Sequence, residues 1–173
     1  MKKDIYMSEH EHLKLLKERR SIRSYDSKEI EEGILTQILE VCRYCMSARN
    51  LQPWTFHVVR NKDLIKKIAK ECTTGPFAAG APVLVAIVGD MELSPNWYLY
   101  DTCFVSLQLA LAAWSFGIGT CWIGRINREN VKKLLNLKES DHLLTVLPLG
   151  YPKDKIPEPL PRKSLDEIVK YID

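Results

Sequence analysis

The sequence predicts a single mixed domain in which helices and strands alternate. Segments with helical periodicity and short apolar segments follow one another with no linker, repeat or low-complexity tract between them. The length, 173 residues, allows one domain with a sizeable core and little room for a second. Hydrophobic residues at 46% and charged residues at 27% exclude a disordered, collagen-like or membrane chain. We therefore expect residues 1–173 to form one globular domain.

The N-terminal third is predicted to contain two helices. Ser8 followed by Glu11 has the spacing of a capping box, which predicts a short helix ending near Arg19. A second helix is predicted to start at Asp26 or Ser27, because apolar residues recur from there at intervals of three and four. These apolar residues are Ile30, Ile34, Leu35, Ile38, Cys42 and Cys45.

The middle of the chain predicts two strands and two helices. Residues 54–59 are aromatic and β-branched, which is typical of a strand, and a helix is expected around 64–69. Residues 82–88 are apolar on both faces and so predict a strand inside a sheet that is covered on both sides. The helix predicted over 99–116 is apolar nearly all round, so its own domain or a second subunit must bury it. Its most apolar face carries Cys103, Leu107, Ala110, Leu111 and Trp114.

The C-terminal third predicts two more strands, 120–123 and 143–149, with a helix between them that is capped by Asn127. Four prolines in 151–161 predict an extended arm, because proline continues neither a helix nor a central strand. A last short helix should begin at Ser164.

Charge and cysteine content narrow the class of protein. A net charge of +3 is too small to indicate nucleic acid or an anionic membrane surface as partner. Five cysteines, an odd number, favour reduced thiols in the cytoplasm, and no secretory signal is expected at the N-terminus. Four scattered histidines predict no metal site, and Cys42 and Cys45 lack the preceding strand of a redox motif.

Two cationic clusters could bind an anion. Three guanidiniums and a hydroxyl lie within five residues of each other, a set that can hold a phosphate. A second cationic pair precedes the last helix, where it needs either solvent or an anion as partner. Both clusters could equally be solvated surface. The first comprises Arg19, Arg20, Ser21 and Arg23, and the second comprises Arg162 and Lys163.

Two further segments carry candidate binding groups. Ser47, Asn50 and Gln52 offer hydrogen-bond donors and acceptors suited to the edge of a planar heterocycle, although an ordinary polar connection would look the same. Three glycines in 116–124 would let the backbone approach a flat ligand, or would serve as a helix cap and a bulge. They follow a helix and precede a strand, the reverse of a dinucleotide-binding motif.

Taken in chain order, these segments resemble the flavin-dependent nitroreductase family. The resemblance covers about residues 15–170, and its specificity lies in the order and spacing of five modest motifs. The motifs are RRSIRSY at 19–25, SARNLQPWTF at 47–56, GIGTCWIG at 117–124, LPLGYP at 147–152 and PRKSLDEIV at 161–169.

The resemblance implies an α+β fold, with a mixed, mainly antiparallel central sheet flanked by helices, in an intertwined homodimer. It implies non-covalent FMN at the subunit interface, with the C-terminal arm, 151–173, packed on the partner. By the same resemblance Arg19, Arg20, Ser21, Arg162 and Lys163 would hold the phosphate and ribityl side, and Arg23 would reach the N1/O2 edge of the ring. Ser47, Asn50 and Gln52 would come from the partner subunit, and the backbone of Ile123 and Gly124 would face N5.

The implied activity is ping-pong hydride transfer from NADH or NADPH to an electron-poor small molecule such as a nitroaromatic or a quinone. The flavin would carry the chemistry, so no catalytic side chain is assigned. Two departures from the family concern Met46, where many members have proline, and 72–81, which lacks the Asn and Lys contacts of some larger members. The alternative is a flavin-binding protein or flavin-consuming enzyme without nicotinamide-driven turnover.

Overall fold

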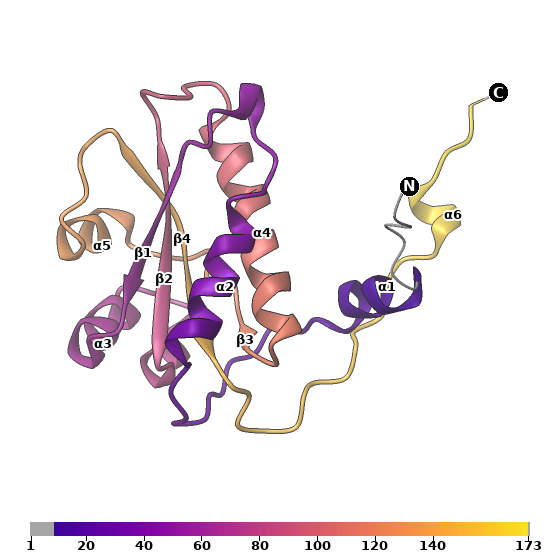
Figure 1. Cartoon of the computed structure of the whole chain (residues 1–173), viewed down its shortest axis with the longest axis horizontal. Helices are drawn as coiled ribbons and strands as arrows, with labels where there is room; N and C mark the ends of the chain where they lie inside the picture. Colours follow the sequence, from indigo (N-terminus) through magenta and orange to yellow (C-terminus); the bar gives the residue numbers. More distant parts are fainter. Residues whose placement is uncertain (1–8, 173) are drawn as a thin grey trace, which may run out of the picture.

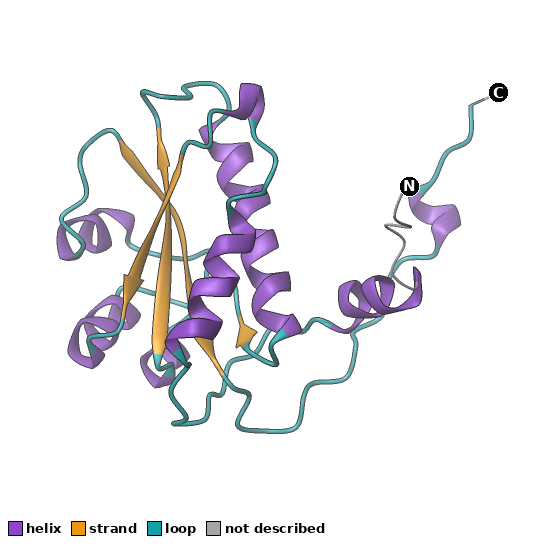
Figure 2. Cartoon of the chain, viewed as in Figure 1, coloured by secondary structure: helices purple, strands orange, loops and turns teal. Residues whose placement is uncertain are grey.

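The fold is an α+β arrangement of one four-stranded sheet with helices on both faces (Figures 1 and 2). A computed structural model describes residues 9–172. The strand order is β1-β2-β4-β3, and each neighbouring pair is antiparallel. The strands are β1 (Trp54–Val59), β2 (Val83–Asp90), β3 (Gly119–Thr120) and β4 (Asp141–Gly150). The helices are α1 (Glu9–Glu18), α2 (Glu32–Cys42), α3 (Lys62–Lys70), α4 (Tyr98–Ser115), α5 (Arg128–Leu134) and α6 (Leu165–Ile168), with 3-10 turns η1 (Ala48–Asn50) and η2 (Pro76–Gly80).

Strand β2 lies inside the sheet, as its unbroken apolar sequence predicts. Every residue from 83 to 89 is buried, because alternate side chains enter two separate cores. Val85 and Ile87 belong to the core under α2 and α4. Leu84 and Val88 belong to the core under α3 and α5. The sheet is therefore covered on both faces.

Two predicted boundaries are wrong. Helix α2 starts at Glu32, not at Asp26 or Ser27, because Asp26 is used in a turn. Its Oδ1 accepts the Lys28 N–H at 2.8 Å, and its own N–H donates to the Tyr151 carbonyl at 2.8 Å. The predicted strand 120–123 ends at Thr120, and Ile123 forms an isolated bridge to Val146.

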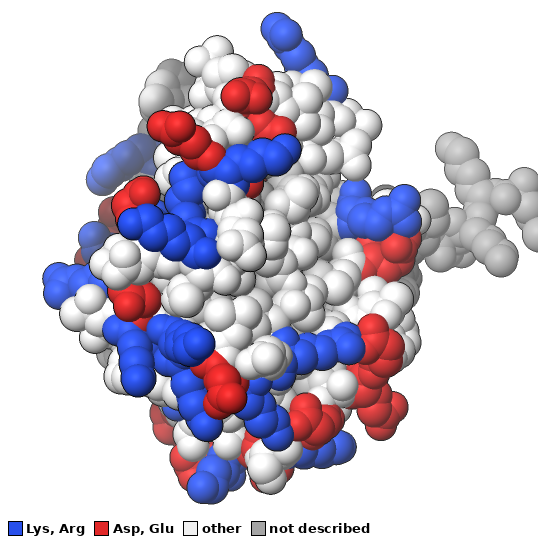
Figure 3. All heavy atoms as spheres, turned by 90° about the vertical axis from the view of Figure 1, so that its left-hand side faces the viewer, with Lys and Arg blue, Asp and Glu red and all other residues white. Residues whose placement is uncertain are grey.

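Helix α4 exposes only part of its predicted most apolar face, because Cys103 and Trp114 pack against buried clusters. Leu107 is 55% exposed and the neighbouring Phe104 is 47% exposed. The surface continues onto the end of α2, where the Gln108 side chain donates to the Val41 carbonyl at 2.6 Å. On the opposite side of the molecule, acidic and basic side chains are interspersed, as expected of a face in water (Figure 3). The residues of α4 that face the sheet core are Val105, Leu109, Ala112 and Ala113.

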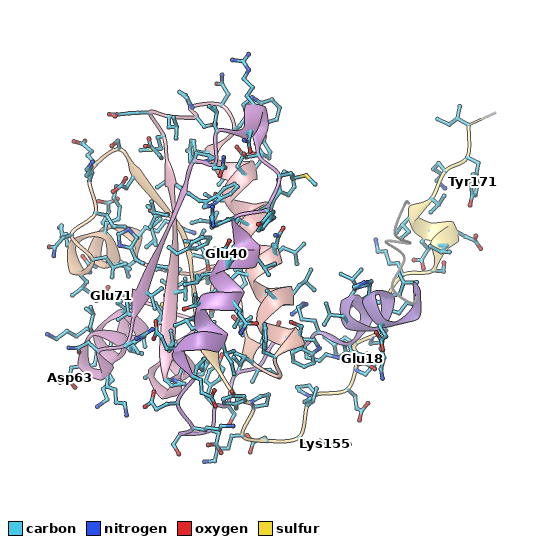
Figure 4. All side chains as sticks on the ribbon, in the orientation of Figure 1. Glu18, Glu40, Asp63, Glu71, Lys155 and Tyr171 are labelled. Carbon is cyan, nitrogen blue, oxygen red and sulfur yellow. The ribbon has the colours of Figure 1, made fainter. Side chains whose placement is uncertain are left out.

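The C-terminal arm leaves the sheet and extends, in the view of Figure 1, to the same side as α1, away from both cores. The predicted last helix is present, with a reciprocal capping box between Ser164 and Glu167. Its apolar side chains are exposed, Leu165 at 72% and Ile168 at 62%. Tyr171 lies near the far end of the arm, remote from the sheet, whereas Lys155 lies near the sheet (Figure 4). Across residues 9–172, no helix is both long and apolar enough to cross a bilayer.

Candidate functional site

The first arginine cluster is held against the edge of the sheet by backbone contacts. Ser21 forms a parallel bridge with Thr120, and the Ile22 N–H donates to the Thr120 carbonyl at 3.0 Å. Ile22 is buried, whereas Arg23 points out and is exposed. The alternation of side chains along this extended segment thus anchors one residue and presents the next.

Two glycines make room for this segment. Gly119 and Gly150 are register partners in the β3–β4 pair. A Cβ atom on Gly119 would collide with the Ile22 side chain, and one on Gly150 would come within 2.9 Å of the Tyr25 ring. The Tyr25 hydroxyl in turn donates to the Ile22 carbonyl at 2.6 Å. Close packing on glycine therefore fixes the arginine-bearing segment on the sheet.

The cluster contains cationic and polar atoms without partners. Arg20 Nη1 donates to the carbonyls of Lys17 at 2.7 Å and Arg19 at 3.1 Å. Its Nε and the Thr120 hydroxyl are buried, and neither finds a hydrogen-bond partner within the described part of the chain. No ion pair joins Arg19, Arg20 or Arg23 to a carboxylate among residues 9–172. Buried polar atoms are nearly always satisfied, so these groups indicate a site for an anionic or polar ligand.

The cluster also borders a pocket of about 220 Å³. Ser21 and Arg23 line one side of it, and residues of the C-terminal arm, including Pro152 and Lys155, line the other. The Arg23 guanidinium lies 6.0 Å from the centroid of the Phe77 ring, within the range of a cation–π contact. One wall of the pocket thus carries the Arg23 cation, and the arm wall carries both Lys155 and Asp154.

Cys121 is a neighbour of this cluster to which the sequence assigned no role. Burial raises the pKa of its thiol, and the nearby Arg23, Ser21 and Arg19 partly offset that rise. The thiol thus lies among the residues that are candidates for phosphate binding. All five cysteines are free thiols, as predicted.

The amide-bearing loop, residues 47–52, is strained. Arg49, Asn50 and Gln52 adopt positive φ angles of 53°, 55° and 50°. These backbone conformations are left-handed, and they are energetically unfavourable for residues that carry a side chain. Such strained residues are often retained at functional sites. The Gln52 N–H donates to Ser47 Oγ at 3.0 Å, which closes the loop on itself. The predicted candidates Ser47, Asn50 and Gln52 are therefore held together.

The arginine cluster and the amide loop lie at opposite ends of α4. The Ala48 N–H donates to Asp101, in the first turn of the helix. Thr120, which pairs with Ser21, follows the last turn. An 18-residue helix is about 27 Å long at 1.5 Å per residue. One chain therefore does not bring these two groups of candidates together.

The remaining candidates are distributed as follows. Ile123 is buried, and its carbonyl accepts the Thr145 hydroxyl at 3.0 Å. Gly124 is exposed beside it, and these two residues follow Thr120, the bridge partner of Ser21, by three and four positions. Arg162 and Lys163 are exposed on the arm, and in the described part of the chain neither forms an ion pair. Among residues 9–172, no grouping of side chains could hold a metal ion.

Comparison with known proteins assigns the family. The family model described as "Putative TM nitroreductase" matches residues 11–173. The chain belongs to the nitroreductase family. A "Putative NADH dehydrogenase/NAD(P)H nitroreductase" of Archaeoglobus fulgidus is 34% identical over an alignment 150 positions long, and the alignment covers 83% of this chain and 86% of the relative. The "FMN reductase [NAD(P)H]" of Bacillus subtilis is 28% identical over an alignment 185 positions long, gaps included, and the alignment covers 93% of this chain and 74% of that protein.

The nitroreductase fold is confirmed by solved structures. The crystal structure of a "Putative NADH dehydrogenase/NAD(P)H nitroreductase" from Parabacteroides distasonis superposes on this chain with a TM-score of 0.86 at 25% identity. It covers 91% of this chain and 96% of that one. The predicted α+β class and the mainly antiparallel sheet flanked by helices are thus confirmed.

Proposed function

We propose that this nitroreductase-family chain is an FMN-dependent oxidoreductase that passes hydride from NADH or NADPH to an electron-poor small molecule. The acceptor class is a nitroaromatic or quinone, and the order is ping-pong, with the nicotinamide leaving before the acceptor binds. The observation that carries the proposal is the set of arginines on the edge of β3, with buried polar atoms that lack partners among residues 9–172. The names of the similar proteins support both FMN and NAD(P)H.

The residues present fit the phosphate end of FMN. Arg19, Arg20 and Ser21 offer charged and neutral donors on one rigid segment, and Arg20 Nε lacks a partner within the described chain. Charge-assisted donors of this kind bind phosphate strongly. Arg162 and Lys163 would complete this cationic site from the arm.

The ring end requires different groups. Arg23 would lie at the N1/O2 edge, where a fixed cation stabilises developing negative charge. The backbone of Ile123 and Gly124 would face N5. FMN supplies the hydride chemistry when bound, and the task of the chain is to bind it, orient it and hold a place for the two substrates in turn.

We further propose that the functional unit is a homodimer. Ser47, Asn50 and Gln52 lie about a helix length from the arginines of their own chain, so a second copy would supply them to each flavin. The half-exposed Phe104 and Leu107 of α4 and the exposed arm give each subunit an apolar surface for its partner. Each site would then take its arginines from one subunit and its amide loop from the other.

The test follows the visible absorption of bound flavin through one catalytic cycle. The purified protein should be yellow, or take up added FMN, and release flavin on denaturation. Under anaerobic conditions NADH or NADPH should bleach the flavin band, and a nitroaromatic or quinone should restore it. A colourless protein that takes up no FMN contradicts the proposal. A yellow protein that neither nicotinamide bleaches favours a flavin-binding protein or a flavin-consuming enzyme instead.

A further inference from the structure

Asp101 is a buried carboxylate near the N-terminus of α4. It lies in the first turn of α4 and is 2% exposed. Its Oδ1 accepts the Ala48 N–H at 3.1 Å, whereas its Oδ2 has no partner within the described chain. Burying a carboxylate is costly unless it makes strong bonds, so its presence needs a reason. The N-terminus of α4 lowers that cost, since helix dipoles favour negative charge there.

The bond from Asp101 reaches the strained loop of residues 47–52. Among the described residues other than glycine, positive φ angles occur at three positions of this loop and at one other, Asn136. Within the described chain, the hydrogen bonds of Ser47, Leu51 and Gln52 join residues 47–54 to one another. The bond from Ala48 to Asp101 joins this self-contained loop to the rigid helix. Among the described residues, it is the one hydrogen bond between residues 47–52 and α4.

We propose that Asp101 is a positioning residue for the flavin: it fixes the loop that carries Ser47, Asn50 and Gln52 in the orientation that meets the partner subunit's flavin. This inference rests on the proposed function. Asp101 itself touches no reacting atom, and it acts through the Ala48 N–H. Because that N–H adjoins Ser47, the bond also fixes the hydroxyl that closes the loop on Gln52.

A purely structural role is the competing explanation, and Thr102 provides the matched control. Thr102 is the next residue of α4 and is fully buried, and its hydroxyl donates to the Tyr98 carbonyl of its own helix at 2.7 Å. Thr102→Val therefore removes a buried hydrogen bond from the same turn without touching the loop. Asp101→Ala removes the acceptor, and Asp101→Asn keeps an oxygen acceptor while removing the charge.

The experiment measures FMN dissociation constants by flavin fluorescence, melting temperatures, and hydrogen exchange of the loop amides in holoenzyme. Asp101→Ala should weaken FMN by about tenfold or more and Asp101→Asn by about threefold, since the bond to a charged acceptor is the stronger one. Exchange of the Ala48 and Gln52 amides should quicken in the same order. Thr102→Val should lower the melting temperature and leave both FMN affinity and loop exchange unchanged.

Three results would overturn the inference: unchanged FMN affinity in both Asp101 variants, equal loss of affinity in Thr102→Val, or unchanged loop exchange. If Asp101→Ala does not fold, the comparison of Asp101→Asn with Thr102→Val decides the question. Wild-type protein is measured first. Its failure to bind FMN would refute the proposed function, whereas failure of the inference would leave wild-type binding intact.

Discussion

Substitution of Leu107 by glutamate places a charge on the α4 surface that we assign to the dimer. Leu107 is 55% exposed in the single chain, so a partner would bury about half of its side chain. Complete burial of a leucine side chain stabilises by about 1.5 to 3 kcal/mol, so burial of half of it stabilises by about 1 kcal/mol per subunit. In a two-fold symmetric dimer both copies of Leu107 are replaced, so the loss of binding free energy is about 2 kcal/mol per dimer.

The introduced carboxyl adds a second penalty. To remain in an apolar interface at pH 7, the carboxyl must take up a proton. Because its ordinary pKa is about 4.3, protonation at pH 7 costs up to about 4 kcal/mol of free energy. The leucine loss alone raises the dissociation constant about thirtyfold, and the carboxyl raises it further.

Sedimentation velocity with simultaneous absorbance of protein and flavin measures the effect. Leu107→Glu should shift the protein to monomer and release FMN. Thr73→Glu is the control, because it makes the same charge change at an exposed position in the turn after α3. A Leu107→Glu protein that stays dimeric, with one FMN per subunit, would refute the assignment of this surface.

Three further predictions concern single side chains. Arg19→Ala should weaken FMN binding by about 1 to 3 kcal/mol, because a charge-assisted contact is lost. Fluorescence titration measures the affinity, and the surface control Arg43→Ala should leave it unchanged. Unchanged FMN affinity in Arg19→Ala would contradict the role of Arg19. Burial, with the nearby charges of Arg128 and Lys132, lowers the pKa of His142, so the unfolded chain takes up its proton first as pH falls below about 6.5. Stability should therefore fall from pH 7 to pH 5, and urea unfolding should show a smaller fall in His142→Gln; parallel profiles would exclude this linkage. Cys103 is half-buried, and burial raises the pKa of its thiol, so alkylation at pH 8 should be slow in wild-type protein. Alkylation should be faster in Leu107→Glu, where the partner no longer covers this face of α4. Equal rates would argue against burial of this face by a partner.

The elements that the sequence predicts well are those with a strong local pattern. Strand β2 is apolar at every position, and α4 is ended by Gly117, whose φ of 72° suits a helix C-terminus. The start of α2 was missed because Asp26 bonds to Tyr151, more than a hundred residues away, instead of capping a helix. A local pattern does not contain that contact.

The sequence offers candidate site residues, which stay predictions, and does not give their geometry. The motifs single out the arginines and the amide loop as candidates, and the packed structure places them at opposite ends of α4. The sequence suggests no role for Asp101, because its hydrogen-bond partner, the Ala48 N–H, lies 53 residues earlier in the chain. A lone carboxylate in an apolar helix was the available signal. Cys121 was likewise overlooked, since its neighbours come from another segment.

The central claim is that each flavin site is built from two subunits, and mixing two damaged chains tests it. One chain carries Arg20→Ala and Arg23→Ala, and the other carries Asn50→Ala and Gln52→Ala. Each alone should bind FMN poorly. In a mixed dimer, one site would combine both sets of damage and the other would be intact.

The measurement is the FMN content of an equimolar mixture refolded together. Random pairing makes about half of the dimers mixed, so about a quarter of all sites should regain wild-type FMN affinity. NADH-driven or NADPH-driven turnover should return in the same proportion. A mixture that binds no more FMN than its two components would show that each site belongs to one chain, and would contradict the account.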